Sequence, residues 1–112
     1  MGNKQSKYLH FINENMFSIE MIEDNSNTIP FIDRMFIHPS NDGIEFFHEN
    51  NHITSINWIK IIKWSYLGNL FKIIFNISNK SYYLCFLCIK PKELSSKMNL
   101  IATKLNDESV PN

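Results

Sequence analysis

Residues 53–77 constrain the fold of this chain more than any other stretch. They read ITSINWIKIIKWSYLGNLFKIIFNI, in which apolar and polar residues alternate on both sides of a Gly-Asn pair. Alternation with a period of two is typical of half-buried strands. Gly68 and Asn69 suit a tight hairpin turn because both residue types tolerate a positive φ. We therefore predict an antiparallel sheet, and a binding protein rather than an enzyme.

Similar alternation recurs along most of the chain and predicts seven strands. In the sixth strand, for example, Phe71, Ile73, Phe75 and Ile77 are expected to point inward. Polar or turn-rich segments at 23–27, 38–43 and 78–81 separate the strands. The predicted strands cover residues 17–21, 31–38, 44–49, 53–58, 61–66, 71–77 and 82–89.

The apolar period changes after Pro91, a residue suited to the first turn of a helix. Apolar residues then recur at spacings of four, three and four, which indicates one stripe of an amphipathic helix. Lys97 and Lys104 are expected on its solvent side. We predict an arm over 1–15, one domain over 16–107 and a tail beginning near 107–108. The helical stripe consists of Leu94, Met98, Ile101 and Leu105.

The composition restricts the kinds of partner. Eleven basic and eleven acidic residues give a formal net charge of zero, so we expect no nucleic-acid binding. No apolar run approaches the roughly 20 residues that span a bilayer, and no secretory signal begins the chain. Cys85 and Cys88 are consistent with a reducing compartment, so we expect an intracellular protein.

The first residues match the acceptor pattern for N-myristoylation. Gly2 follows a removable Met, and Ser6 supplies the hydroxyl of the pattern. The alternative is an ordinary N-terminus that begins Met-Gly. One myristoyl chain gives only marginal membrane binding, so a second signal is needed. We predict myristate on Gly2 as a covalent lipid, no other cofactor, and a peripheral location on the cytoplasmic face of a membrane.

Two short motifs resemble metal or redox sites. His48, Glu49 and His52 match the His-Glu-x-x-His string of zinc peptidases, whose chemistry requires a helix. Here the string falls between two predicted strands, so we expect no zinc site. Cys85 and Cys88 are three residues apart on a predicted strand and would face opposite sides of it. We therefore expect neither a metal site nor catalysis.

The central motif resembles a known fold family. Residues 43–47 read GIEFF, and they are followed by Ile53-Thr54, by Ile56-x-Trp58-x-x-Ile61-x-Lys63-Trp64-Ser65-Tyr66 and by Phe71-x-Ile73. This run resembles the third lobe of FERM domains, especially the talin and myosin-tail type, within the pleckstrin-homology and phosphotyrosine-binding superfold. The resemblance covers about residues 17–106. It implies a seven-stranded antiparallel sandwich or partly open barrel, capped by a C-terminal helix and free-standing at this length.

That resemblance also implies a peptide site between the fifth strand and the helix. An edge strand has unpaired backbone groups that accept an added strand, which supports such a site independently. We predict a membrane-anchored adaptor that binds a peptide or protein partner there. The alternative is that Trp64 packs in the core and Tyr66 covers a sheet face. The implied site residues are Lys63, Trp64, Ser65, Tyr66, Ile101 and Leu105.

Two other functions remain open at this point. The first is binding of a lipid headgroup such as a phosphoinositide through lysines, although the segment 24–27 lacks the basic residues that many pleckstrin-homology domains use there. The second is a structural subunit that buries its edge strand in a larger membrane-associated complex. The headgroup lysines would be Lys4, Lys7, Lys60, Lys63, Lys72 and Lys80.

Overall fold

The computed structural model describes residues 16–30 and 33–109 of the chain. In this part, seven antiparallel strands form one sheet and a helix follows at the C-terminal side, which confirms the predicted fold class. The elements are β1 (Phe17–Asp24), β2 (Met35–Pro39), β3 (Gly43–His48), β4 (Asn51–Asn57), the 3-10 helix η1 (Trp58–Lys60), β5 (Ile61–Leu67), β6 (Leu70–Ile77), β7 (Lys80–Cys88) and α2 (Pro91–Ser109).

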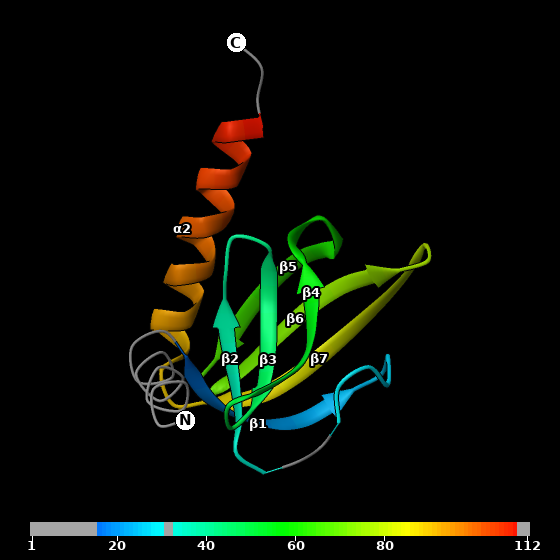
Figure 1. The fold of residues 1–112 in the computed structure, drawn as a ribbon, viewed down its shortest axis with the longest axis vertical. Coiled ribbons are helices and arrows are strands. Elements are labelled where there is room, and N and C mark those ends of the chain that lie inside the picture. Colours follow the sequence, from blue (N-terminus) through cyan, green and yellow to red (C-terminus); the bar gives the residue numbers. More distant parts are fainter. Residues whose placement is uncertain (1–15, 31–32, 110–112) are drawn as a thin grey trace, which may run out of the picture.

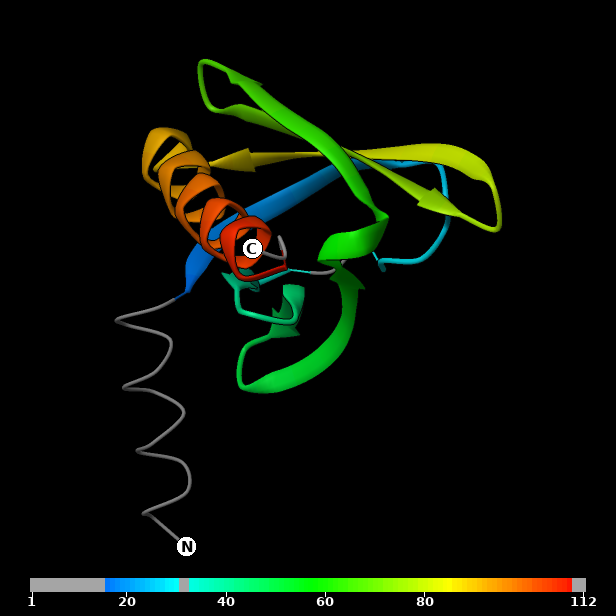
Figure 2. The same cartoon turned by 90° about the horizontal axis from the view of Figure 1, so that it is seen from above.

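The sheet is curled but not closed. Its strand order is β4-β3-β2-β1-β7-β6-β5, so β1 lies in the middle and β4 and β5 form the two edges. Figure 1 shows α2 running along one side of the sheet, and Figure 2 shows the sheet curving around the helix. Helix α2 packs against β5 and β2, one strand from each half of the sheet. The helix therefore fills the opening that the unpaired edges leave.

The core lies between the concave face of the sheet and α2. Phe71, Ile73 and Phe75 are buried, as the alternation predicted, while Lys72 and Asn76 between and beyond them are exposed. From the helix, Leu94 and Met98 are fully buried. Burial of an apolar side chain of this size contributes roughly 1.5–3 kcal/mol. These two residues alone therefore hold α2 firmly in the opening.

Several predicted boundaries were wrong for local reasons. Strand β2 begins at Met35 rather than at residue 31, because Arg34 adopts a positive φ of 62° that a strand does not allow. Trp58 does not end β4 but begins η1, because the Asn57 side chain accepts a hydrogen bond from the Ile59 amide and turns the chain. Helix α2 continues to Ser109, beyond the predicted start of the tail.

The segment after β1 is fixed by a buried carboxylate. Asp24 accepts hydrogen bonds from the backbone amides of Ser26, Thr28 and Ile29 at 2.7–2.9 Å, and from the Ser26 hydroxyl at 2.6 Å. An anion that accepts several backbone hydrogen bonds organises a loop in the same way as a helix cap. The polar sequence 24–28 therefore has a structural role, which accounts for its composition without a ligand.

Candidate functional site

A groove lies beside the β5 edge, where η1, the beginning of β5 and the C-terminal half of α2 meet the turn between β2 and β3. We call it the β5 groove; its volume is about 830 Å³. Its position agrees with the predicted region between the fifth strand and the helix. The residues that line it are Asn41, Asp42, Asn57, Trp58, Ile59, Ile61, Ile62, Trp64, Ala102, Thr103, Leu105 and Asn106.

Two tryptophans give the groove a rigid wall. The Trp58 indole N–H donates a hydrogen bond of 2.7 Å to the Ser40 carbonyl oxygen, which ties η1 to the β2–β3 turn. The Trp58 and Trp64 rings meet edge to face with their centroids 5.9 Å apart. Both rings also pack against the core. Because these contacts fix both side chains, the groove is preformed rather than created by a ligand.

Two isoleucines at the rim are unusually exposed. Ile59 on η1 is 87% exposed and Ile62 on β5 is 49% exposed. The register between β5 and β6 shifts between Ile61 and Lys63, so Ile62 lies at an irregularity of the strand. Exposed apolar side chains beside a preformed groove with two tryptophans in its wall are typical of a binding surface.

The β5 edge itself supplies backbone groups. Among the described residues, β5 pairs with β6 on one side and with no strand on the other. Such an edge has N–H and C=O groups that can accept an added strand. The groove and the open edge together match the physical requirements for binding an extended peptide.

The predicted site residues separate into three groups. Trp64 and Leu105 line the groove. Lys63 and Ser65 are exposed and alternate with Trp64, so they lie on the opposite, outer face of β5. Trp64 packs against the core, as the alternative expected, and also lines the groove.

The remaining two predicted residues lie elsewhere. Tyr66 stacks on Phe71 with ring centroids 6.0 Å apart, as the alternative expected of a residue that covers a sheet face. Ile101 is half-buried on α2 and is not among the lining residues of the groove.

Sequence reasoning did not name Ile59 of η1 as a site residue. Ile59 was assigned to a short connection, although an apolar residue in a connection is itself a signal that it contacts something. Asn57 was also missed, because its role depends on the turn that its own side chain caps. The sequence did contain a signal for this turn. An Asn two residues before an apolar residue in a connection favours a turn that the Asn side chain caps.

The electrostatics of the groove disfavour a negatively charged ligand. Among the lining residues, Asp42 is the one with a charged side chain. A phosphorylated peptide would need Arg or Lys to bind its phosphate. The described lining provides none, so a neutral or weakly basic segment suits this groove better.

The lysines of the headgroup alternative lie on different elements. Lys60 is on η1, while Lys72 lies on the outer face of β6 with its Nζ 4.8 Å from the centre of the Tyr83 ring. Lys80 pairs with Ile77 of β6. Ile77 lies five residues along β6 from Lys72, so Lys80 and Lys72 are roughly 17 Å apart along the sheet. Lys63 and Lys72 are diagonal neighbours on the outer face. Lys4 and Lys7 lie outside the described residues.

The His-Glu-x-x-His string spans the turn between β3 and β4, and Cys85 and Cys88 lie on β7, as predicted. His48 pairs with Asn51 and His52 pairs with Phe47 across the β3–β4 hairpin, so the two imidazoles face opposite sides. His52 instead approaches Glu45, with its Nε2 3.9 Å from Oε1. In the described part of the chain, no three His, Cys, Asp or Glu side chains gather in a way that would hold a metal.

The β7 thiols are protected from ionisation. Cys88 is buried in the core and Cys85 is half-buried on the other face, as expected for residues three apart on a strand. Burial raises the pKa of both thiols. The hydrogen bond from Tyr83 to Glu23, 2.6 Å long, also raises the pKa of the Tyr83 phenol. These thiols are therefore poor nucleophiles near neutral pH.

Comparison with known proteins gives no assignment, since neither a protein-family model nor a curated protein sequence matches this chain. Among the described residues, no helix is both long and apolar enough to cross a membrane. Functional inference therefore depends on the fold and on the geometry of the β5 groove.

Proposed function

We propose that this chain is a non-enzymatic adaptor that binds an extended segment of a protein partner in the β5 groove. One observation carries the proposal: among the described residues, an unpaired strand edge lies beside a preformed groove that Trp58 and Trp64 line and whose rim exposes Ile59 and Ile62. The resemblance to the FERM third lobe supports the same location. On this proposal the partner adds a strand to β5 and places apolar side chains against Trp58 and Trp64.

The bound segment is expected to be short, apolar and unphosphorylated. Backbone hydrogen bonds to β5 would supply affinity for any extended chain, while alternate side chains would determine which sequence fits. Asp42 would favour a basic residue near the β2–β3 turn. Tryptophans are frequent energetic centres of interfaces, so Trp58 and Trp64 are expected to contribute most of the binding energy.

Membrane attachment is the second part of the proposal. Gly2 would carry the myristoyl group, and the partner in the groove would supply the second signal that a single acyl chain requires. Gly2→Ala should then release the protein from membranes in the cell. Unchanged membrane association of this variant would contradict the acylation, and it would leave peptide binding to be judged by its own test.

Peptide binding can be measured with the intrinsic fluorescence of the protein. The chain has two tryptophans, and both line the groove, so a change in their emission reports occupancy. Extended peptides selected from a random ten-residue library against the full chain provide the probes. Ile62→Asp should weaken their binding about tenfold or more, because it places a charge at the apolar rim.

A matched control distinguishes the groove from general stickiness. Leu100 is exposed on α2 and does not line the groove, so Leu100→Asp should leave the affinity unchanged. Equal affinities of wild type and Ile62→Asp would refute the β5 groove as the site. Vesicles containing phosphoinositides, tested on unacylated protein, address the headgroup alternative; headgroup-dependent binding would favour it over the adaptor.

A further inference from the structure

A second apolar surface lies on the outer face of the sheet, away from the core. Leu67, Leu70 and Leu87 form one row across β5, β6 and β7, because Leu67 pairs with Leu70 and Leu70 pairs with Leu87. Ile89 follows the end of β7, two residues beyond Leu87, and lines the same cavity as Leu87. Leu67 is 85% exposed and Ile89 is 78% exposed. We call these four residues the outer apolar row.

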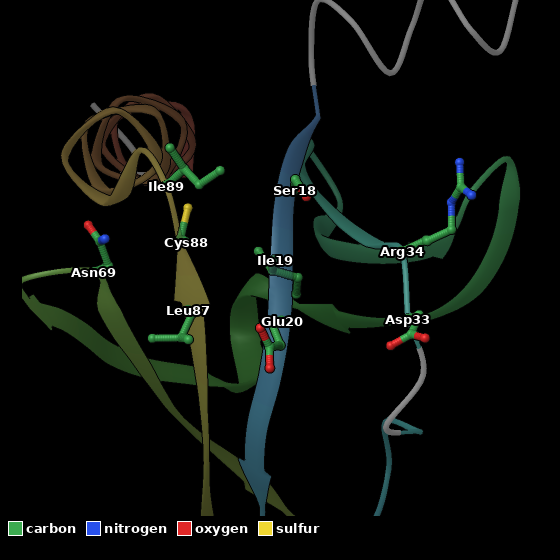
Figure 3. A pocket seen from close by; sticks show the side chains of 9 residues that line it. All are labelled: Ser18, Ile19, Glu20, Asp33, Arg34, Asn69, Leu87, Cys88 and Ile89. Atoms are coloured by element: carbon green, nitrogen blue, oxygen red, sulfur yellow. The ribbon is translucent and has the colours of Figure 1, made fainter.

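Two hollows adjoin the outer apolar row. The first, of about 410 Å³, lies over β1 and β7 and is bordered by Leu87 and Ile89, with Asn69 on one side and Arg34 on the other, as Figure 3 shows. The second, of about 360 Å³, shares Ser18, Cys88 and Ile89 with the first and extends to Met16 and Lys90. The row and the hollows form one continuous surface.

The described part of the chain begins at this surface. Met16, the first described residue, lines the second hollow. Residues 1–15 precede it, and Tyr8, Leu9, Phe11 and Ile12 form an apolar cluster in that segment. We infer that the apolar cluster at residues 8–12 binds back onto the outer apolar row of its own chain.

The distances permit this contact. The row lies opposite Glu20, four residues or roughly 13 Å along β1 from Met16, and neighbouring strands are about 4.8 Å apart, so Leu70 lies roughly 16 Å from Met16 and Leu67 roughly 19 Å. Four extended residue steps from Ile12 to Met16 span up to about 13 Å, and seven steps from Leu9 to Met16 up to about 23 Å. The Leu9 end of the cluster can therefore reach every residue of the row without moving the domain.

The charged side chains around the two hollows also favour residues 8–12 as the bound segment. Glu20 and Asp33 border the first hollow, and Glu93 borders the second. Basic residues are also present there, but Arg34 pairs with Glu49 at 3.0 Å, which leaves Lys90 as the other cation of the lining. Lys7 and Glu14 flank the cluster in the N-terminal segment, His10 lies within it, and Lys4 gives residues 1–15 one more basic than acidic side chain. A segment with a small positive excess thus meets hollows lined by more acidic than unpaired basic side chains.

Limited proteolysis of the full chain tests the inference. Chymotrypsin cleaves after Phe11 only when this segment is released, so the cleavage rate reports the released fraction. Leu70→Asp should raise the rate of cleavage after Phe11, followed by mass spectrometry, about tenfold or more, which corresponds to about 1.4 kcal/mol. Leu100→Asp, an equally charged change on an exposed leucine of α2, should leave this rate at the wild-type value.

A second variant keeps the test valid if Leu70→Asp disturbs the β5–β6 hairpin. Ile12→Asp changes only the N-terminal segment, and it should shift the backbone amide NMR signals of residues 67–70 and 87–89. Equal cleavage rates for wild type and Leu70→Asp in a folded protein, or unchanged amide signals in Ile12→Asp, would overturn the inference. Protection that rises with protein concentration would also overturn it, because it would mean that a second copy covers the row.

Discussion

The two edges of the sheet differ in what they expose. On β4, the exposed residues are all polar, whereas β5 exposes Ile62 and Leu67 in addition to Lys63, Ser65 and Tyr66. The exposed residues of β4 are Asn51, His52, Ser55 and Asn57. Helix α2 packs against β5, and the β5 groove forms between them. Both edges have unpaired backbone groups, so the backbone alone does not distinguish them. An edge becomes a candidate binding site when apolar side chains and a second wall accompany it.

The same contrast explains how β4 avoids unwanted association. Polar side chains along an exposed edge disfavour edge-to-edge pairing with another chain. On β5, the exposed side chains of Ile62 and Leu67 weaken this protection, which raises the risk of aggregation. Variants on the two edges test the difference.

The largest expected effect comes from Gly43, the β3 residue that pairs with Asn57 at the end of the edge strand β4. An added Cβ would collide with the Ile56 carbonyl oxygen and would lie 2.9 Å from the Asn57 Cα, at a φ of 156°. Gly43→Ala should lower the free energy of unfolding by at least about 2 kcal/mol. In the β5–β6 hairpin, Gly68 has open space around it and a φ of 59°, so Gly68→Ala should cost only about 1 kcal/mol. Urea unfolding of both variants gives the comparison, and the reverse order would show that β4 tolerates displacement.

The next effect concerns the attachment of η1, which holds the groove open beside β5. Trp58→Phe removes the hydrogen bond to the Ser40 carbonyl and should cost about 1–2 kcal/mol. Trp64→Phe makes the same ring change at a residue whose indole has no hydrogen bond among the described residues, and it should cost less. Thermal unfolding measures both costs. If Trp64→Phe proved the more damaging, the tie to the β2–β3 turn would not be what stabilises the wall.

A smaller effect separates the aromatic contacts at the two edges. Tyr66→Ala removes the stacking on Phe71 at the β5 edge and should cost roughly 1 kcal/mol. His52→Ala removes an edge contact with Phe47, 5.3 Å between centroids, and a weak approach to Glu45 at the β4 edge. Because His52 is exposed, its loss should cost about 0.5 kcal/mol or less. Chemical denaturation of the pair checks the order, which equal costs would contradict.

The smallest effect is a dependence on alkaline pH that belongs to β7, inside the sheet rather than at either edge. Burial raises the pKa of Cys88 and Cys85, and hydrogen bonding to Glu23 raises the pKa of Tyr83. A raised pKa stabilises the folded state below the unfolded pKa, and this contribution is lost as the pH rises through the folded value. The free energy of unfolding should therefore fall above roughly pH 8.5.

The contribution of the buried Cys88 thiol is isolated by comparing wild type and Cys88→Ala in the slope of the free energy of unfolding against pH. Cys88→Ala should flatten the decrease in stability between neutral pH and roughly pH 10, even though the lost side chain lowers stability at every pH. An unchanged slope would show that Cys88 does not contribute to the pH dependence.

Alternation of residue types predicted the strands well because each side chain on a strand has one of two environments. Phe71, Ile73 and Phe75 were assigned correctly to the core for this reason. The turn at Gly68 was also predictable, since few residues accept its positive φ. The boundaries at Arg34 and Trp58 were not, because they depend on a single residue's φ and on one side-chain hydrogen bond.

The candidate site was predictable in its location and only partly in its residues. Trp64 and Leu105 line the groove as the resemblance implied, whereas Ile59 and Ile62 gain their role from η1 and from the irregularity of β5. Neither of these features has a periodic signature.

The sequence by itself determined an antiparallel sheet of seven strands, a C-terminal helix and their inward faces, because period and turn chemistry are local properties. Only the tertiary structure decided which edge is polar and which borders a groove, because that depends on where α2 rests in the opening of the sheet. It also decided that Leu67, Leu70 and Leu87 form one row across three strands. Such neighbours are set by the register between strands, which packing of the whole core fixes.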